Sequence, residues 1–220
     1  MKALVLREKL AADFPAVPAY LVELGGSFCN FGILMRDGGK PSDSLEWFAK
    51  AIGALAPIHE REPRDVMARK FLRNCHAGRA MAHDRLQHFA EAISDWDKAI
   101  ELSPKEEQPG YRAERATARL QAGQVAEAVA EVAELSKSSN WNAGRLYDFA
   151  CAYAVASGKF ADKKDEDAKR AVELLHQAVK AGYKNAAHMK KDRDFDPLRD
   201  DFKQLLAELE KKSPRTPEKK

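Results

Sequence analysis

Apolar positions along the chain recur every three or four residues, with small and large side chains in a fixed order. Ala92, Trp96 and Ala99 show the order most clearly, because residues at this spacing share one stripe of a helix. Pro104 follows and is expected to end that helix. Two small residues beside an indole leave room for a second helix to approach, while the ring fills the gap. The stripe therefore predicts a helix packed tightly against a neighbour.

The same order occurs in three further places, and each copy follows another amphipathic segment and a turn. The stripes of these copies are Ser44, Phe48 and Ala51; Ala128, Val132 and Leu135; and Ala171, Leu175 and Ala178. The preceding segments carry a small residue where two helices would cross, at Gly32, Ala80, Ala116 and Ala150. A turn glycine follows at Gly39 and Gly123, whereas Gln87 takes that place in the second copy. The chain therefore repeats a unit of helix, tight turn and helix.

This unit resembles the tetratricopeptide repeat (TPR), over most of the chain. The resemblance implies an all-α, right-handed solenoid of antiparallel helix pairs. A stack of repeats must cover its exposed ends, so capping helices are expected on both sides. The predicted organisation is one domain of residues 1–212, with an N-terminal cap at 2–13, repeats at about 17–62, 63–104, 108–137 and 142–181, and a C-terminal cap at 184–212. Residues 213–220 contain two prolines and no apolar anchor, and are predicted to be a disordered tail.

Composition supports an all-α protein and narrows its surroundings. Alanine, glutamate, lysine and leucine are strong helix formers, and hairpin signals between alternating runs are missing. The net charge of +3 over 220 residues gives no reason to expect nucleic acid as a partner. Three dispersed cysteines, Cys29, Cys75 and Cys151, suit reduced thiols in the cytoplasm. No apolar run approaches the length of a membrane span or of a signal-peptide core.

Three segments are also similar to the TPR tails of planctomycete bacterial serine/threonine kinases. They are residues 6–20 (LREKLAADFPAVPAY), 146–155 (LYDFACAYAV) and 182–209 (GYKNAAHMKKDRDFDPLRDDFKQLLAEL). The sequence contains no glycine-rich phosphate loop, HRD or DFG motif. The resemblance implies a tail or a free-standing relative without the kinase domain.

No pattern in the sequence assembles a catalytic, cofactor or metal site. The six histidines lack the close spacing that zinc ligands usually show. The acidic run at residues 162–167 lacks the alternating oxygen ligands of a calcium loop. Asp192, Asp194 and Asp196 alternate with other residues and are interpreted as a turn into Pro197. We expect a protein that is not an enzyme and needs neither cofactor nor metal.

The TPR resemblance implies a concave groove lined by the first helix of each repeat. The residues that the family pattern places there are mostly apolar and lack the lysine and asparagine set that clamps a chaperone's carboxylate. We expect a non-catalytic interaction module that binds a partner peptide or helix in this groove. The alternative is a self-assembling scaffold, a homo-oligomer formed through the end helices. The implied groove residues are Cys29, Ile33, Arg36, Ala77, Met81, Asp84, Ala113, Thr117, Leu120, Tyr147, Cys151 and Ala154.

Arginines recur at one place in the second and third copies, where many TPRs carry leucine. Arg79 and Arg115 each have an acidic residue at the equivalent place of the following helix, Asp95 and Glu131. We predict two intra-repeat ion pairs, Arg79–Asp95 and Arg115–Glu131, both partly buried. The alternative is a basic strip for an acidic peptide or phosphate, formed with Arg69, Arg73, Arg112 and Arg119.

Overall fold

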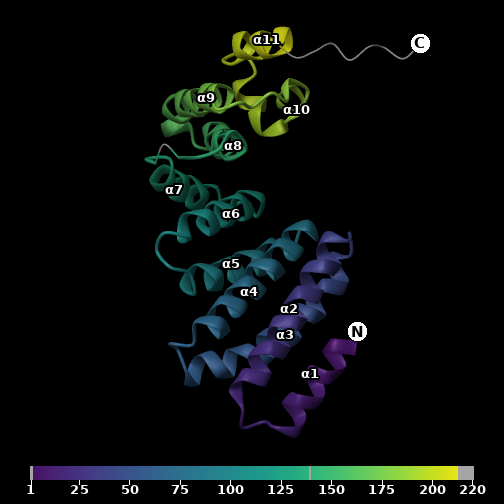
Figure 1. Cartoon of the computed structure of the whole chain (residues 1–220). Coiled ribbons are helices and arrows are strands. Elements are labelled where there is room, and N and C mark those ends of the chain that lie inside the picture. Colours follow the sequence, from purple (N-terminus) through teal and green to yellow (C-terminus); the bar gives the residue numbers. More distant parts are fainter. Residues whose placement is uncertain (1, 139, 213–220) are drawn as a thin grey trace, which may run out of the picture. The chain divides into compact units, whose positions relative to one another are not determined.

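The computed structural model describes residues 2–138 and 140–212, and within these ranges the chain forms helices and no strand (Figure 1). The predicted all-α class is confirmed. The chain divides into two compact units, residues 1–122 and 123–220, and each is described separately. A single continuous domain stays a prediction, and the predicted tail at 213–220 lies outside the described residues.

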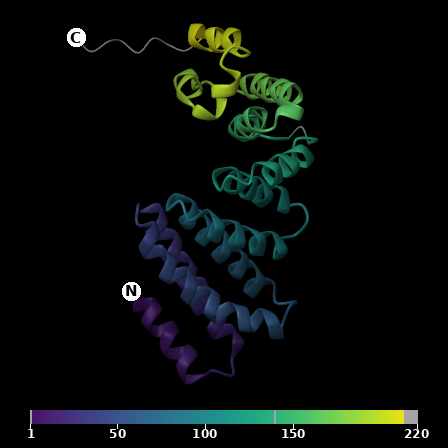
Figure 2. The same cartoon turned by 180° about the vertical axis from the view of Figure 1, so that it is seen from behind.

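Unit 1 consists of helix pairs that follow one another along the chain. Helix α2 packs against α3, α4 packs against α5, and the first helices α2 and α4 also touch (Figures 1 and 2). Prolines begin α2 and α3, where the missing N–H costs nothing, and Asp65 caps α4 by accepting from the backbone N–H of Met67 and Ala68. The helices are α1 (Lys2–Asp13), α2 (Pro18–Asp37), α3 (Pro41–Arg61), α4 (Val66–Arg85), α5 (Phe89–Glu101) and α6 (Gln108–Gln121).

The stripes of small and large residues face the core of unit 1. Phe48 is completely buried. A Cβ added to Gly32 would lie 2.7 Å from its ring, and a Cβ added to Gly78 would lie 2.6 Å from it. Glycine at these two places therefore lets α2 and α4 approach the phenylalanine of α3. Trp96 is 2% exposed, and the alanines of its stripe are fully buried. The burial predicted from the stripe is confirmed.

The tight turns use the left-handed backbone conformation that the sequence pattern requires. Gly39 has φ of +79° and Gly123 has φ of +76°. Gln87 adopts φ of +61°, a conformation that an L-residue with a side chain rarely takes. The second copy thus keeps the turn geometry without the glycine.

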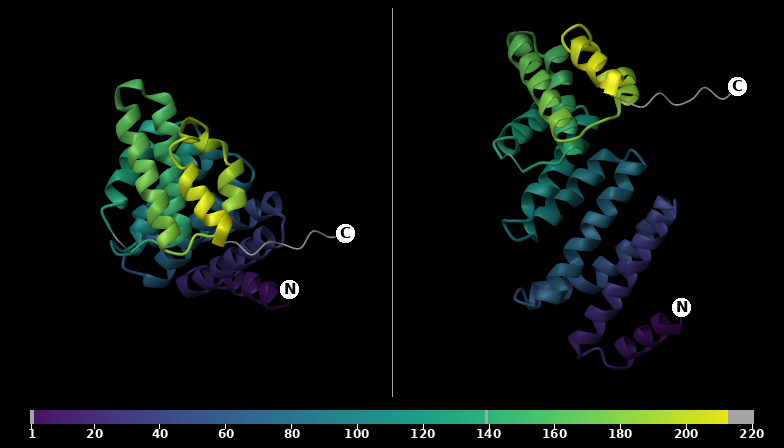
Figure 3. Two further views of the ribbon diagram at one scale, coloured as in Figure 1. Left: turned by 90° about the horizontal axis from the view of Figure 1, so that it is seen from above. Right: turned by 45° about the horizontal axis from the view of Figure 1, so that its top comes forward.

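Unit 2 is built around the pair α8 and α9, and the remaining segments pack beside it (Figure 3). The 3₁₀ helix η2 packs on α8, and α10 touches α11. The predicted stripes at Ala128–Leu135 and Ala171–Ala178 are buried here as well. The elements are α7 (Val125–Leu135), α8 (Ala143–Lys159), η1 (Ala161–Lys163), α9 (Lys164–Lys180), α10 (Ala186–Lys191), η2 (Arg193–Leu198) and α11 (Lys203–Lys212).

The segment after α9 supplies an apolar layer at the C-terminal end of unit 2. Its buried residues are Met189, Phe195, Leu198, Phe202, Leu205 and Leu209, all at most 4% exposed. The rings of Phe195 and Phe202 pack edge to face, with centroids 5.4 Å apart. Residues within the predicted C-terminal cap therefore belong to the core of this unit.

Candidate functional site

The first helices of unit 1 carry the predicted groove residues that a partner could reach. Met81 on α4 is 39% exposed, and Leu34 on α2, which the family pattern does not place in the groove, is 62% exposed. Five other predicted residues are half-buried, namely Ile33, Ala77, Asp84, Thr117 and Leu120. These side chains come from α2, α4 and α6, so three helices contribute to the candidate binding face.

Three predicted groove residues of unit 1 lie inside the protein instead, and their assignment to the groove is corrected. Cys29 and Ala113 are each 1% exposed and belong to the core. Cys29 and Cys75 of α4 belong to the same buried cluster, and burial raises the pKa of the Cys75 thiol. The third residue, Arg36, is 7% exposed. The TPR sequence pattern predicts which face of a helix a residue occupies. How deeply its side chain is buried depends on the neighbouring helix.

Arg36 joins α2 to α4 from this buried position. Its guanidinium pairs with Asp37, with Nε 2.9 Å from Oδ1, and Nη1 lies 3.2 Å from the Met81 sulfur. Nη1 also lies 3.5 Å from the carbonyl oxygen of Gly78. These contacts hold the Met81 side chain at the surface of the binding face.

A pocket of about 430 Å³ lies between the end of α4 and α6. Asp84 is its most unusual residue: Oδ2 accepts a hydrogen bond of 3.0 Å from Trp96 Nε1, but the buried Oδ1 has no donor among the described residues. Burial, together with the nearby Glu114, raises the pKa of Asp84 to about 6, although the hydrogen bond from Trp96 acts in the opposite direction. A residue that lines the pocket therefore has a buried acceptor without a donor. Its lining residues are Asp84, Arg85, Gln87, Phe89, Glu114, Thr117, Ala118 and Gln121.

The structure brings Arg79 and Asp95 together and adds a histidine that the sequence pattern does not show. Arg79 Nε lies 2.7 Å from Asp95 Oδ2, and His76 Nδ1 lies 2.8 Å from Asp95 Oδ1. Asp95 is 4% exposed, so its carboxylate is buried among three donor atoms. His76 lies three residues before Arg79, one turn of α4 away. This spacing in the sequence could have indicated that both side chains reach the same carboxylate.

Arg115 has a partner in unit 1 that the sequence pattern does not show. Its guanidinium pairs with Asp97, on the exposed side of α5. Glu131 belongs to unit 2, where it is buried, and the Arg115–Glu131 pair stays a prediction. Arg73 pairs with Glu107 at 2.6 Å. Arg73, Arg79 and Arg115 of the alternative basic strip are therefore engaged within unit 1.

The TPR resemblance also assigned Tyr147 and Cys151 of unit 2 to the groove, and this assignment is corrected. Both residues lie under the C-terminal segment and are only 4% and 6% exposed. The Tyr147 hydroxyl donates to Asp192 Oδ2 over 2.7 Å, and its ring stacks on Tyr183 with centroids 4.4 Å apart. Asp192 Oδ1 accepts from the backbone N–H of Asp194 at 3.1 Å. Cys151, Asp192 and Asp194 each offer one atom that could ligate a metal ion, and these three atoms lie within 4.8 Å of one another. Since both Asp192 oxygens have hydrogen-bond partners, we assign this cluster to anchoring the segment.

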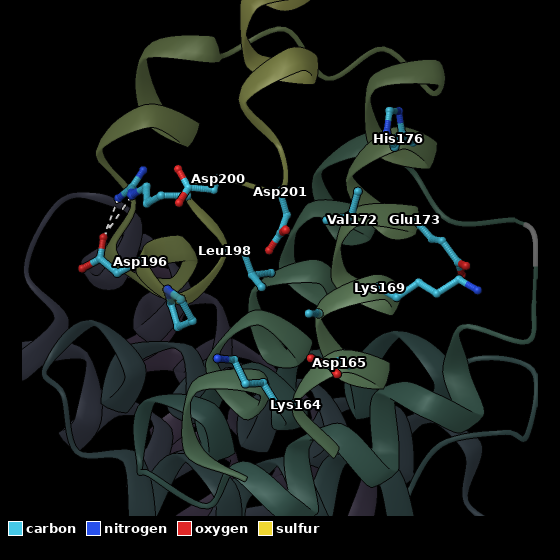
Figure 4. Close-up of a pocket in the computed structure, with 13 residues that line it drawn as sticks. Lys164, Asp165, Lys169, Val172, Glu173, His176, Asp196, Leu198, Asp200 and Asp201 are labelled. Atoms are coloured by element: carbon cyan, nitrogen blue, oxygen red, sulfur yellow. Dashed lines mark hydrogen bonds and ion pairs between the residues drawn. The ribbon is translucent and has the colours of Figure 1, made fainter. Parts of the chain in front are cut away.

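Another recess of about 640 Å³ lies between α9 and η2 (Figure 4). Asp196, Leu198 and Asp200 line one side, and Lys169, Glu173 and His176 line the other. Asp196 pairs with Arg199 at 2.7 Å, and Glu173 pairs with Arg170 at 3.0 Å. Two of its carboxylates are therefore paired within the protein, and we assign no ligand to this recess.

Comparison with known proteins agrees with the repeat pattern. Residues 74–106 match the family model of the tetratricopeptide repeat. A solved structure of a MamA double mutant (MamA RS-1 ArsTM) has a TM-score of 0.55 at 16% identity, covering 86% of this chain and 95% of that one. A putative kinesin light chain of Podosopora anserina with nearly identical TPR-like repeats has a TM-score of 0.58 at 17% identity, covering 88% and 93%. The fold is a TPR-type helical repeat.

These similarities extend to the fold alone, because the identities are low. No curated protein matches the chain. The TPR-type fold is generally a scaffold for protein–protein interaction. Among the described helices, none combines the length and the apolar composition that crossing a membrane requires.

Proposed function

We propose that the chain is a non-catalytic interaction module that binds a partner segment on the candidate binding face of unit 1. The observation that carries the proposal is the combination at the end of α4: an exposed Met81 beside Asp84, whose Oδ1 is buried without a donor. A buried acceptor without a donor is costly, and a bound peptide can supply the missing N–H. Met81 offers an adaptable apolar contact next to it. We therefore expect a partner with an apolar side chain close to an amide or backbone donor.

Selection from a peptide-display library against the full chain tests this proposal, followed by titration of the enriched peptide. Met81→Glu is expected to weaken binding at least about tenfold while the helical content is unchanged, because a charge in an apolar contact must be desolvated. Met67→Glu is the matched control, since it makes the same change at an exposed position of α4, about 21 Å away along the helix. Equal binding by both variants would place the peptide elsewhere.

A self-assembling scaffold is the second candidate, favoured by the exposed apolar face of α1 and the turn after it. Val5, Leu6, Leu10 and Phe14 are between 38% and 62% exposed. Burial of this face against a second copy would stabilise a dimer. Light scattering distinguishes the two: this candidate requires twice the 24.5 kDa chain mass for the wild type and a single chain mass for Leu6→Glu.

The remaining sequence-based inferences belong to this proposal. All three cysteines are free thiols, which fits a reducing compartment such as the cytoplasm. The proposed partner is a protein or peptide rather than nucleic acid. The similarity to kinase TPR tails is likewise proposed as a relationship of the repeats, without the kinase activity.

A further inference from the structure

A recess of about 400 Å³ in unit 2 is lined by none of the residues discussed for the binding face of unit 1. Its floor is one apolar side of α7, formed by Ala126, Val129, Ala130 and Ala133. Tyr153 of α8 and Phe160 contribute aromatic rings to its lining. Its volume is within the range of about 300–1,000 Å³ that is usual for ligand pockets. The remaining lining residues are charged: Asp162, Lys163, Glu166 and Asp167.

Asp167 in the first turn of α9 is the residue of this recess that most needs an explanation. It is 6% exposed, and it lines both this recess and an adjoining one of about 300 Å³. No hydrogen bond or close ion pair to its carboxylate is found among the described residues. Burial raises the pKa of Asp167, and Glu166 raises it further, while Lys163 acts in the opposite direction. The start of a helix favours a negative charge, but it does not supply the missing donors.

Neither Arg170 nor Lys163 supplies the missing partner of the Asp167 carboxylate. Arg170, also on α9, is engaged by Glu173 and by the Ser136 hydroxyl, at 3.0 and 3.3 Å. Lys163 is exposed and shares the rim with the two further carboxylates of Asp162 and Glu166. The rim is therefore acidic, and a buried polar group without a partner usually marks an absent ligand or water.

The lining matches one side chain better than the others. Arginine has an apolar stem that packs along alkyl groups, as on the α7 floor, and a planar cation that stacks on aromatic rings such as Tyr153 or Phe160. Its guanidinium presents paired donors that suit a carboxylate. Lysine carries a strongly hydrated ammonium, which is less suited to the carboxylate of a residue that is only 6% exposed.

We propose that the recess between α7 and the start of α9 binds an arginine side chain of a partner segment, with the guanidinium on the Asp167 carboxylate and the stem on the alanine floor. This site lies in unit 2 and is independent of the face proposed on unit 1. A partner that uses it would present an exposed arginine with apolar neighbours.

The test uses the full chain with ¹³C-labelled alanine methyl groups and two probes, Nα-acetyl-arginine N-methylamide and its neutral citrulline isostere. The arginine probe is expected to shift the methyl signals of Ala126, Ala130 and Ala133 saturably, and to leave Ala92 of unit 1 unchanged. The citrulline probe should bind about tenfold more weakly or worse, because it cannot form the ionic hydrogen bonds.

Two variants complete the design. Asp167→Asn is expected to abolish the preference for arginine over citrulline, whereas Asp165→Asn, an exposed carboxylate in the same helical turn, should keep it. Ala130→Leu fills the recess from an exposed position and should remove the shifts even if Asp167→Asn folds poorly. Equal shifts from both probes, absent shifts, or an unchanged preference in folded Asp167→Asn would each overturn the proposal.

Discussion

At the scale of single residues, Asp95 shows how this repeat stabilises a buried charge. Its carboxylate is 4% exposed and accepts hydrogen bonds from Arg79 and His76 on the preceding helix. Burial raises the pKa of Asp95, but the bonds from His76 and Arg79 outweigh burial, so the pKa is lowered overall. The folded state therefore favours the ionised carboxylate, and stability depends on keeping it ionised.

Asp95→Asn is expected to lower the free energy of unfolding by about 1–3 kcal/mol at neutral pH, since the Arg79 side chain is 27% exposed and water screens part of the pair. Because the pKa of Asp95 is lower in the folded state, its ionised carboxylate stabilises the fold fully at pH values above the pKa in the unfolded state, about 3.9. This contribution is lost as the pH falls below that value. The difference between wild type and variant should therefore shrink below about pH 4. Urea titrations across this pH range measure it.

Asp97→Asn is the control, because Asp97 lies on the same helix with a half-exposed side chain paired to Arg115. Its effect should stay below about 1 kcal/mol. If both variants lose the same stability, or if the Asp95→Asn difference does not change with pH, the lowered pKa does not stabilise the fold.

At the scale of helices, close approach rather than helix propensity decides where glycine is required. Gly78 of α4 lies against the Phe48 ring of α3, and a Cβ there would sit 2.6 Å from it. Gly53 of α3 lies in open space, with nothing within 4 Å of its would-be Cβ. Both glycines are inside helices, so propensity alone predicts that alanine stabilises both.

Alanine substitutions at the two glycines should therefore have opposite signs. Gly78→Ala is expected to destabilise the chain by about 1–3 kcal/mol through overpacking against Phe48. Gly53→Ala should stabilise it by about 0.5–1 kcal/mol. Chemical denaturation of both variants measures the change in the free energy of unfolding. Stabilisation by both substitutions would show that the Phe48 ring moves aside at little cost.

At the scale of the whole molecule, each unit has its own core, and the C-terminal segment completes the core of unit 2. Phe195, Leu198 and Phe202 are at most 1% exposed and cover apolar side chains of the same unit. The Tyr147–Asp192 hydrogen bond ties the segment to α8. Within the segment, the Arg199 guanidinium donates to the backbone carbonyl oxygens of Lys190 and Asp192. Unit 2 should therefore depend on this segment for its stability.

Deletion of residues 195–220 is expected to expose apolar surface in unit 2 and to accelerate hydrogen exchange in α8 and α9. Each large apolar side chain removed from the core accounts for about 1.5–3 kcal/mol of burial. Deletion of residues 213–220 alone is the control and should leave exchange unchanged. Identical exchange profiles for the two truncations would show that the segment is not part of the core.

The sequence by itself determined the helices, the turns and the buried stripes. Periodicity at three and four residues depends only on helix geometry, and the prolines and left-handed turn positions act locally. Residues such as Trp96 and Phe48 could therefore be predicted as core without knowledge of the tertiary structure.

Only the tertiary structure decided the depth and the partners of individual side chains. Cys29, Arg36, Tyr147 and Cys151 lie on faces that a repeat pattern assigns to a groove, yet each is buried by a segment distant in sequence. Arg115 pairs with Asp97 on the neighbouring helix, Asp84 has a buried oxygen without a donor, and Asp167 lines two recesses. These outcomes depend on where along their axes two separate helices contact each other. The periodicity of apolar residues within one helix carries no information about that position.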